Sequence, residues 1–396
     1  MKIAFLTAGG IAPCLSASIG ALIDEYNKLA PEAELIGYLN GYRGLLLGKS
    51  IVIPDSVKQN AQILSEFGGS PIGNSRVKLT NIDDCLKSGY VKKGEDPLEV
   101  AAKQLIKDKV DILHTIGGDD TNTMAAELAK YLKENDYKLT VVGIPKTVDN
   151  DIKPITQTLG ALTAAEQGAI FFENIVNENT TSTRQLIIHE VMGRHCGWLT
   201  AATAVAYRHR LNERNFLPEI QLSKERWDID AIYIPELNFD MKAEMQRLKK
   251  LMDENDCVNI FLSEGAGKDE IVAEMEANNE DVPRDAFGHV KLDLINPGEW
   301  FAKKFSKELE ADKTLVQKSG YFARSAAPNT RDLALIEATA MLATEAALAG
   351  ENGVVGMDED SNDDMHLIDF TRIEGGKKFN TELGWFQTLI NSIGQI

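Results

Sequence analysis

Hydrophobic and polar positions along the chain alternate between two kinds of segment. Short runs rich in Val, Ile, Leu and Phe, bounded by glycine, proline or polar residues, predict buried β-strands. Longer segments with apolar residues three and four positions apart predict amphipathic helices. The predicted strands are residues 2–6, 110–115, 139–144, 184–191, 229–234 and 258–263. The predicted helices are residues 15–29, 121–134, 160–177, 196–207, 241–254 and 331–349.

The order of these elements predicts the fold class α/β, with mainly parallel sheets covered by helices. A chain of 396 residues is too long for one ordinary hydrophobic core, so we expect two lobes. Residues 351–364 (ENGVVGMDEDSNDD) are acidic and rich in Gly and Asn, which predicts a loop. Residues 265–289 are polar and irregular, and we expect an insertion or a flap there.

Composition and charge narrow the classes of function. The chain is 43% hydrophobic and 26% charged, as globular proteins are. A formal net charge of −18 argues against a nucleic-acid-binding surface. The cysteines form no C-x-x-C pair, which predicts reduced thiols and a cytoplasmic protein, and the histidines show no metal-ligand spacing.

The sequence predicts a soluble chain without a membrane partner. The apolar run that follows Lys2 ends at Gly9-Gly10 and is shorter than the apolar region of a signal peptide. No stretch approaches the roughly 18 uncharged apolar residues that a membrane-spanning helix needs.

Three polar, glycine-bearing segments follow predicted strands, at the edge where open α/β sheets bind ligands. The first is Thr7-Ala8-Gly9-Gly10. Its glycines allow backbone N–H groups to approach an anion at the start of a helix. A glycine pair in such a turn also occurs for purely structural reasons, so this motif alone decides nothing.

The second segment is Gly117-Gly118-Asp119-Asp120-Thr121-Asn122-Thr123. Two glycines leave room for phosphates, and a carboxylate after them suits Mg²⁺ held on phosphate oxygens. Helix capping is the alternative interpretation, because Asp and Thr are preferred at that position. Two adjacent aspartates exceed what a cap requires, which favours the ion-binding interpretation.

The third segment is Gly143-Ile144-Pro145-Lys146-Thr147-Val148-Asp149-Asn150-Asp151. Lys146 can neutralise charge on a transferring phosphoryl group, and Asp149 can accept the proton of an attacking hydroxyl. A polar turn rich in Asp and Asn is the alternative interpretation. The three segments together indicate phosphoryl transfer, but they leave the substrate open, because the Gly-Gly-Asp element also occurs in NAD kinases and lipid kinases.

Further motifs make the chain resemble the phosphofructokinase family more closely than those kinases. Seven motifs occur in order over most of the chain: GG at 9–10, GNSR at 73–76, GGDD at 117–120, PKTVDND at 145–151, MGRHCGW at 192–198, SEG at 263–265 and GYFARS at 320–325. The resemblance implies two Rossmann-like lobes. Residues 1–160 plus about 321–396 would bind the pyrophosphate donor and Mg²⁺, and residues 161–320 would bind fructose 6-phosphate.

The same resemblance assigns roles to residues. Gly10, Asp120 and Lys146 would contact pyrophosphate, Asp119 would hold Mg²⁺, Asp149 would be the general base, and Arg76 would stabilise the transferring group. The residues expected to bind fructose 6-phosphate are Thr147, Val148, Asp149, Met192, Gly193, Arg194, Glu264, Tyr321 and Arg324. Taken singly, Met192 could be core filler, Glu264 a surface carboxylate and Tyr321 a packed aromatic.

The donor assignment rests on Asp120 and Lys146. ATP-using members of the family usually carry Gly at the first position, and pyrophosphate-using members pair Asp there with Lys at the second. Tyr321 stands where ATP-using members carry His, and Lys318 is a possible further phosphate-binding cation. The resemblance thus implies a reversible, pyrophosphate-dependent 6-phosphofructokinase.

Two rival functions and one departure from the family pattern stay open. The rivals are an ATP-dependent 6-phosphofructokinase and a non-catalytic regulatory subunit, and another sugar phosphate, such as sedoheptulose 7-phosphate, is a possible substrate. Family members are usually homodimers or homotetramers, with an Arg that reaches the sugar phosphate of a neighbouring subunit. Gln185 occupies that position here, and Arg184 lies one residue earlier, on the opposite face of a strand.

Overall fold

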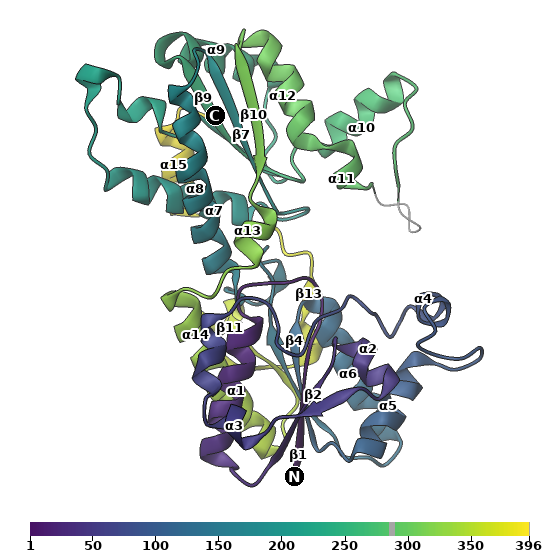
Figure 1. Ribbon diagram of the computed structural model, residues 1–396. Helices are drawn as coiled ribbons and strands as arrows, with labels where there is room; N and C mark the ends of the chain where they lie inside the picture. Colours follow the sequence, from purple (N-terminus) through teal and green to yellow (C-terminus); the bar gives the residue numbers. More distant parts are fainter. Residues whose placement is uncertain (285–289, 396) are drawn as a thin grey trace. The chain divides into compact units, whose positions relative to one another are not determined.

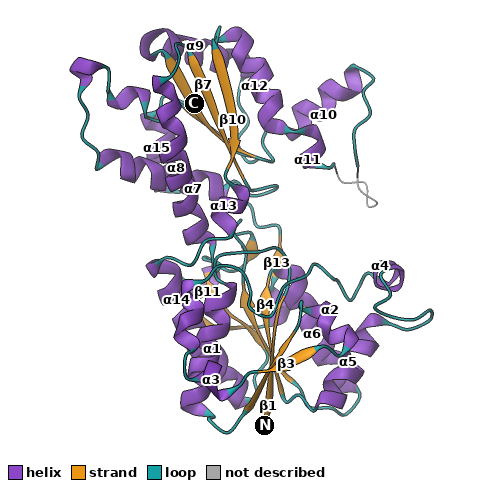
Figure 2. Cartoon of the chain, in the orientation of Figure 1, coloured by secondary structure: helices purple, strands orange, loops and turns teal. Residues whose placement is uncertain are grey.

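The computed structural model describes residues 1–284 and 290–395. The chain forms two compact units: unit 1 comprises Met1–Thr163 and Arg324–Lys377, and unit 2 comprises Ala164–Ala323 and Lys378–Ile396. Helices cover both faces of a largely parallel sheet in each unit, which confirms the predicted fold class (Figure 2). None of the described helices combines the length and apolar character that crossing a membrane requires.

Unit 1 is built on a seven-stranded sheet with the order β12-β11-β5-β4-β1-β2-β3. Its strands are β1 (Lys2–Thr7), β2 (Glu34–Tyr38), β3 (Ser50–Val52), β4 (Ile112–Gly117), β5 (Thr140–Pro145), β11 (Gly353–Asp358) and β12 (Asp364–Ile368). The two edge strands β3 and β12 are antiparallel to their neighbours, and the other strands are parallel. Strand order reverses between β1 and β4, and such a reversal opens a crevice at the carboxyl ends of the strands.

Helices cover both faces of this sheet, so its central strands are buried. Every residue of β4 and β5 is buried. One face is covered by α1 (Leu15–Leu29) and α14 (Thr330–Ala349), and the other by α2 (Tyr42–Leu47), α5 (Pro97–Asp108) and α6 (Asp119–Glu134) (Figure 1). The shorter elements are α3 (Asp55–Lys58), α4 (Ile82–Lys87), β6 (Ile152–Lys153) and β13 (Glu374–Gly375).

Unit 2 is built on a parallel four-stranded sheet with the order β10-β7-β9-β8. Its strands are β7 (Gln185–Val191), β8 (Ala231–Tyr233), β9 (Cys257–Ser263) and β10 (Lys313–Lys318). Its helices are α7 (Ala161–Ile175), α8 (Trp198–Asn212), α9 (Met241–Asn255), α10 (Lys268–Ala277), α11 (Leu292–Ile295), α12 (Pro297–Glu308), α13 (Gly320–Arg324) and α15 (Gly384–Ser392). Single-turn 3₁₀ helices complete the chain at Val176–Thr180, Pro218–Ile220, Lys224–Arg226, Glu359–Ser361 and Phe370–Arg372, with a longer one at Ala61–Glu66.

Alternate residues of the unit 2 strands point to opposite faces of the sheet and pack into two separate layers. Leu186, Ile188 and Ile260 pack with Phe301 and Phe305 of α12 and with residues of α9. On the other face, rings from α7, α8, β7 and β9 pack together: Phe172 stacks on His189, and the contacts with Tyr207 and Phe261 are edge-to-face. This period of two is what a strand covered on both faces requires.

Two loop predictions differ from the structure. The prediction of a loop over residues 351–364 is wrong, because β11 lies there, between β5 and β12, with Val354 and Val355 fully buried. The apolar run of this strand is short and is flanked by acidic residues, so the composition of the whole segment resembles that of a loop. Within the segment predicted to be irregular, residues 268–277 form α10, and residues 285–289 lie outside the described residues.

The chain enters unit 2 after Thr163 and leaves it at Arg324, and its last segment, from Lys378, belongs to unit 2. Gln395 explains part of this arrangement. Its side-chain amide accepts from the Ile232 N–H at 2.8 Å and donates to the Ile232 carbonyl at 2.9 Å, at the open edge of β8. Phe386 is fully buried and packs edge-on against Phe379. These contacts depend on tertiary structure, which a boundary taken from motifs cannot register.

Candidate phosphoryl-transfer site

The turn after β1 is held open by a neighbouring segment of unit 1. Gly9 donates its N–H to the Ser75 carbonyl at 2.8 Å, and Asn74 Nδ2 donates to the Gly9 carbonyl at 2.7 Å. Gly9 has a φ of +89°, which a side chain would disfavour. The pairing fixes residues 74–76 along the turn and places Arg76 beside Gly10.

Three cations surround Gly10. Lys146 Nζ donates to the Gly10 carbonyl at 2.7 Å, and Arg324 Nε donates to the Ile11 carbonyl at 2.8 Å. A Cβ atom on Gly10 would overlap the Arg324 guanidinium and lie 3.4 Å from Arg76 Nη2. Glycine at this position lets the guanidinium groups approach the backbone closely, and the cluster can receive an anion with more than one negative charge. Arg324, predicted to bind the sugar phosphate, thus lies at the turn predicted to bind the donor.

Lys146 is the buried member of this cluster. Its side chain is 4% exposed, and its pKa is lowered to about 8, first by burial and then by the charges of Arg324 and Arg76. The charge of Asp149 acts in the opposite direction and raises the Lys146 pKa. A buried ammonium beside two guanidinium groups is costly without a counter-anion. An anionic ligand at this turn would therefore be bound strongly.

The segment Gly117–Thr123 follows β4 and is hydrogen-bonded to the segment that carries Lys146. Lys146 donates its N–H to the Gly117 carbonyl at 2.9 Å. The buried Asn122 amide donates to the carbonyls of Gly117 and Gly118 at 3.2 and 3.1 Å. The residue at the N-cap of α6 is Gly118, so capping by Asp119 or Asp120 does not explain the two aspartates.

Asp119 and Asp120 differ in their surroundings although they are adjacent. Asp119 is half-buried, and burial raises the pKa of its carboxyl group, with the charges of Asp120 and Asp151 acting in the same direction. Asp120 is exposed and forms an ion pair with Lys78. Sequence reasoning missed Lys78, although its position two residues after the GNSR motif could have marked it as a further cation.

A segment near the end of unit 1 approaches Asp119 closely. Strand β13 pairs with β6, Gly375 opposite Ile152. A Cβ atom on Gly375 would overlap the Asp119 carboxylate. The sequence analysis did not single out Gly375, although the pair Gly375-Gly376 between charged residues was a signal of close backbone approach.

Side-chain hydrogen bonds fix the loop that carries Asp149. Thr147 Oγ1 accepts from the Asp149 N–H at 3.2 Å, and Asn150 takes a φ of +55°. Asn150 Oδ1 accepts from the Thr158 N–H at 2.8 Å, and Thr158 Oγ1 donates to the Thr147 carbonyl at 2.8 Å. The Val148 side chain is buried. A loop held in this way gives its carboxylate a defined direction, which a freely moving polar turn lacks.

The remaining predicted sugar-phosphate residues belong to unit 2, at the carboxyl ends of its strands. Gly193 follows β7 with a φ of +131°, and its carbonyl accepts from Ser263 Oγ at 2.5 Å. Glu264 donates its N–H to the Val191 carbonyl at 2.9 Å, and a Cβ atom on Gly265 would overlap the Arg194 carbonyl. Met192, Gly193, Arg194 and Glu264 are therefore neighbours.

Tyr321 follows β10 and is 79% exposed, so it is not a packed aromatic of the unit 2 core. Its neighbour Gly320 lies beside Met192, because a Cβ atom there would be 3.6 Å from Met192 Sδ. Lys318, a possible phosphate-binding cation, is already engaged by Glu190 and Asn296 at 2.8 and 2.9 Å.

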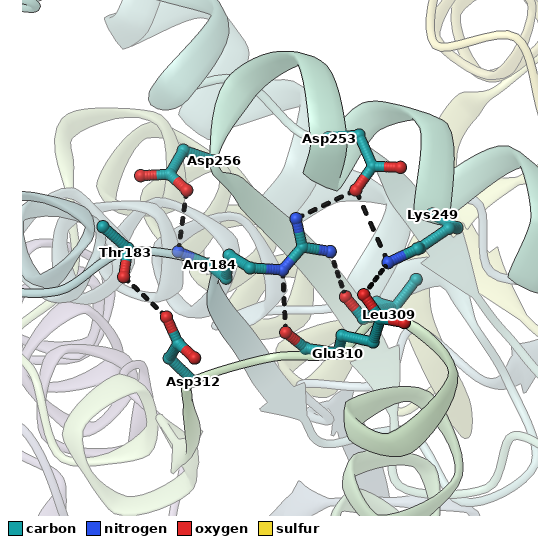
Figure 3. A network of polar contacts seen from close by, with 8 residues as sticks. All are labelled: Thr183, Arg184, Lys249, Asp253, Asp256, Leu309, Glu310 and Asp312. Atoms are coloured by element: carbon teal, nitrogen blue, oxygen red, sulfur yellow. Dashed lines mark hydrogen bonds and ion pairs between the residues drawn. The ribbon is translucent and has the colours of Figure 1, made fainter.

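Arg184 is fully committed to contacts within unit 2 (Figure 3). Its guanidinium donates to Asp253 Oδ1 at 2.9 Å, to the Glu310 carbonyl at 2.8 Å and to the Leu309 carbonyl at 2.5 Å. Gln185 is buried at the start of β7 and accepts from Ser182 Oγ at 2.7 Å. The contacts of the Arg184 guanidinium are therefore with residues 253, 309 and 310 of unit 2.

The donor side offers few ligands for a metal. Within residues 1–284 and 290–395, no three His, Cys, Asp or Glu side chains converge as a metal site. A half-buried Asp119 near an anion-binding turn nevertheless fits Mg²⁺, which keeps several waters and binds through one or two carboxylates and substrate phosphates.

A doubly wound fold with this cation cluster, two aspartates at a helix start and a fixed third aspartate defines a phosphoryl-transfer enzyme. The phosphofructokinase family profile matches residues 2–347. The chain belongs to the phosphofructokinase family, which confirms the assignment from the motifs.

The names of similar proteins specify one activity within this family. The chain is 57% identical to the pyrophosphate–fructose 6-phosphate 1-phosphotransferase of Methylomonas methanica, over 100% of this chain and 96% of that protein. It is likewise 57% identical to the enzyme of that name from Propionibacterium freudenreichii, over 100% and 98% of the two chains. The crystal structure of a pyrophosphate-dependent phosphofructokinase from Marinobacter aquaeolei superposes with a TM-score of 0.70 at 20% identity, covering 98% of this chain and 91% of that one. That last likeness shows the fold alone.

Proposed function

We propose that this chain transfers a phosphoryl group reversibly from pyrophosphate to the 1-hydroxyl of fructose 6-phosphate, giving fructose 1,6-bisphosphate and phosphate. The observation that carries the proposal is that unit 1 holds both Asp120, beside the metal-binding candidate Asp119, and a buried Lys146 at the Gly9-Gly10 turn. The names of the full-length relatives support the same donor and acceptor.

Donor choice follows from charge. Asp120 would face the position of the α-phosphate of a nucleotide and repel it, whereas Lys146 would neutralise the shorter donor. Two unit charges about 4 Å apart interact by roughly 4 kcal/mol at an effective dielectric near 20. Asp120 is exposed, so solvent screens part of this energy. Even about 1.4 kcal/mol changes affinity about tenfold.

The residues of unit 1 divide the chemical work. Asp149 accepts the proton of the sugar 1-hydroxyl, while Lys146 and Arg76 stabilise the charge that spreads over the moving phosphoryl group. Arg324, which lies at the same turn, adds positive charge beside Gly10. Asp119 would hold Mg²⁺, which when bound neutralises charge on the donor oxygens.

The residues of unit 2 would hold fructose 6-phosphate. Met192, Gly193, Arg194 and Glu264 surround the ends of β7 and β9, and Tyr321 follows β10. Thr147, Val148 and Arg324 would complete the sugar contacts from unit 1. On this proposal, unit 1 is the donor lobe and unit 2 the sugar-phosphate lobe.

The proposal also concerns the cellular compartment and the oligomeric state of the protein. The four cysteines are free and buried, which suits the reducing cytoplasm. A homodimer or homotetramer is the form usual in the family, and Gln185 leaves open which residue would reach a neighbouring sugar phosphate.

A coupled assay with fructose 6-phosphate, Mg²⁺ and each donor separately tests the function. We expect turnover with pyrophosphate and initial rates with ATP at least about tenfold lower at equal concentration. The Asp120→Gly variant should lower the ratio of the rate with pyrophosphate to the rate with ATP, because it removes the repelling carboxylate. Faster turnover of the unchanged enzyme with ATP would establish the ATP-dependent rival, and binding of the sugar phosphate without product would establish the regulatory subunit.

A further inference from the structure

Glu190 joins the two sugar-phosphate segments of unit 2 at the edge of its sheet. Strands β7 and β10 are adjacent and parallel, and Lys318 lies opposite Glu190 in their register. Met192 and Arg194 follow Glu190 within four residues, and Tyr321 follows Lys318 by three. The two charged residues are therefore the last strand positions before the two segments that would hold the substrate.

The Glu190 carboxylate, on β7, contacts two other elements, β10 and α12. Its Oε1 pairs with Lys318 Nζ at 2.8 Å, and its Oε2 accepts from the Gly298 N–H at 3.0 Å in the first turn of α12. The side chain of Glu190 is 7% exposed. A Cβ atom on Gly298 would overlap Oε2, so the absence of a side chain there lets the carboxylate approach the helix start.

Two further bonds keep the strand ends together. Lys318 Nζ also donates to Asn296 Oδ1 at 2.9 Å, just before α12, which ties the end of β10 to the same helix start. The buried His189 ring bonds the Ser319 hydroxyl at 2.8 Å, one residue beyond the Glu190–Lys318 pair. Beyond them, Gly320 lies beside Met192, where the two segments meet.

Stability alone is a weak reason for such an arrangement, because burying an ion pair costs desolvation that its attraction does not fully offset. A buried, fully hydrogen-bonded carboxylate instead fixes geometry. Glu190 and its partner Lys318 lie immediately before the two segments. The geometry that the carboxylate fixes is therefore the distance between residues 192–194 and Tyr321.

We propose that Glu190, through Lys318 and the start of α12, is a positioning residue that sets the spacing of the two sugar-phosphate segments. This inference rests on the proposed function, since the spacing matters only if these segments bind the sugar phosphate. Glu190 does not itself touch substrate or donor.

Steady-state kinetics of Glu190→Gln and Lys318→Met test the proposal, with Lys313→Met as the matched control. Lys313 lies at the opposite end of the same strand and forms an ion pair of the same length, 2.8 Å, with Glu178, whose side chain is 42% exposed. Glutamine keeps an acceptor for Gly298 but loses the ion pair, and Lys318 is exposed enough for its variant to fold.

We expect both variants to raise the KM for fructose 6-phosphate about fivefold to tenfold, because sub-ångström displacement of binding groups has effects of that order. The KM for pyrophosphate should stay within about twofold, since the donor turn belongs to unit 1, and Lys313→Met should leave both constants unchanged. The double variant should be no worse than the worse single variant, because both changes break one pair.

Three results would overturn the positioning role: unchanged sugar-phosphate KM in Glu190→Gln, an equal rise in both KM values, or additive effects in the double variant. A raised sugar-phosphate KM in Lys318→Met with an unchanged KM in Glu190→Gln would mean that Lys318 contacts the phosphate directly. Failure of the unchanged enzyme to use fructose 6-phosphate would reject the proposed function instead, which keeps the two failures distinct.

Discussion

At the scale of single residues, the site is defined by what burial does to a few charged groups. Lys146 is buried among cations, Asp119 is half-buried among carboxylates, and Asp120 remains in solvent with Lys78. Adjacent or nearby groups of the same chemical type therefore have different tasks. Two predictions belong at this scale.

The first concerns the general base. Asp149→Ser should lower turnover at least about 10²-fold, the usual contribution of a positioned base. The KM values should change much less, because the hydroxyl leaves the fixed loop in place. Steady-state kinetics in the pyrophosphate-forming and pyrophosphate-using directions measure the effect, and Asp269→Ser, at a side chain that is 94% exposed, is the control. Near-normal turnover in Asp149→Ser would remove Asp149 from this role.

The second concerns the charge of Lys146. Its pKa is lowered from 10.5 to about 8, so the unfolded chain holds more protons than the folded chain between these pH values. This group therefore makes the free energy of unfolding rise with pH from about 8 to 10.5. Activity should change in the opposite sense, because only the protonated form attracts the donor.

The kcat/KM for pyrophosphate should accordingly fall above pH 8, since that ratio reports the pKa values of the free enzyme. The fall in kcat should occur at higher pH, because bound anion stabilises the ammonium. In Lys146→Met the alkaline limb of the kcat/KM profile should be absent. Its persistence in that variant would assign the limb to another group.

At the scale of elements, strand ends and short ribbons bring the groups together. The turn after β1, the start of α6 and the loop after β5 are adjacent because β1, β4 and β5 are neighbours in one parallel sheet. The sequence predicted these strands and placed its three motifs at their ends correctly. It did not predict β13, a two-residue strand with no periodicity to detect.

The β13 ribbon carries a prediction of its own. Gly375→Ala would place a methyl group against the Asp119 carboxylate, and overpacking of this kind costs about 1–3 kcal/mol. We expect the Mg²⁺ concentration for half-maximal rate to rise about tenfold. A Mg²⁺ titration at fixed substrates measures this, and Gly384→Ala, with no atom within 4 Å of its added methyl group, is the control. Equal Mg²⁺ dependence in both variants would show that Gly375 does not shape the Asp119 site.

At the scale of the whole molecule, the division into units does not follow chain order. Unit 1 resumes at Arg324, so the residue that lies on Gly10 is more than 300 positions away from it in the sequence. The segment after Lys377 returns to unit 2, where Phe386 is buried and Gln395 completes the edge of β8.

This arrangement predicts where the last segment contributes stability. Phe386→Ala should lower the free energy of unfolding by about 3–5 kcal/mol, the usual cost of removing a buried aromatic ring. Trp385→Ala should cost clearly less, because Trp385 is 38% exposed. Urea denaturation followed by a probe in each unit measures the loss, which should appear in the unit 2 transition. Equal losses in the two variants would contradict the packing of α15 on unit 2.

The sequence by itself determined the alternation of strands and helices, the motifs at the strand ends and the family. These depend on local periodicity and on short runs of residues, which the chain displays directly. Only the tertiary structure decided that Arg76, Lys146 and Arg324 meet at Gly10, that Gly375 lies on Asp119, and that β11 is a buried strand. Such contacts join residues far apart in the chain, and they depend on strand order and register, which no local pattern specifies.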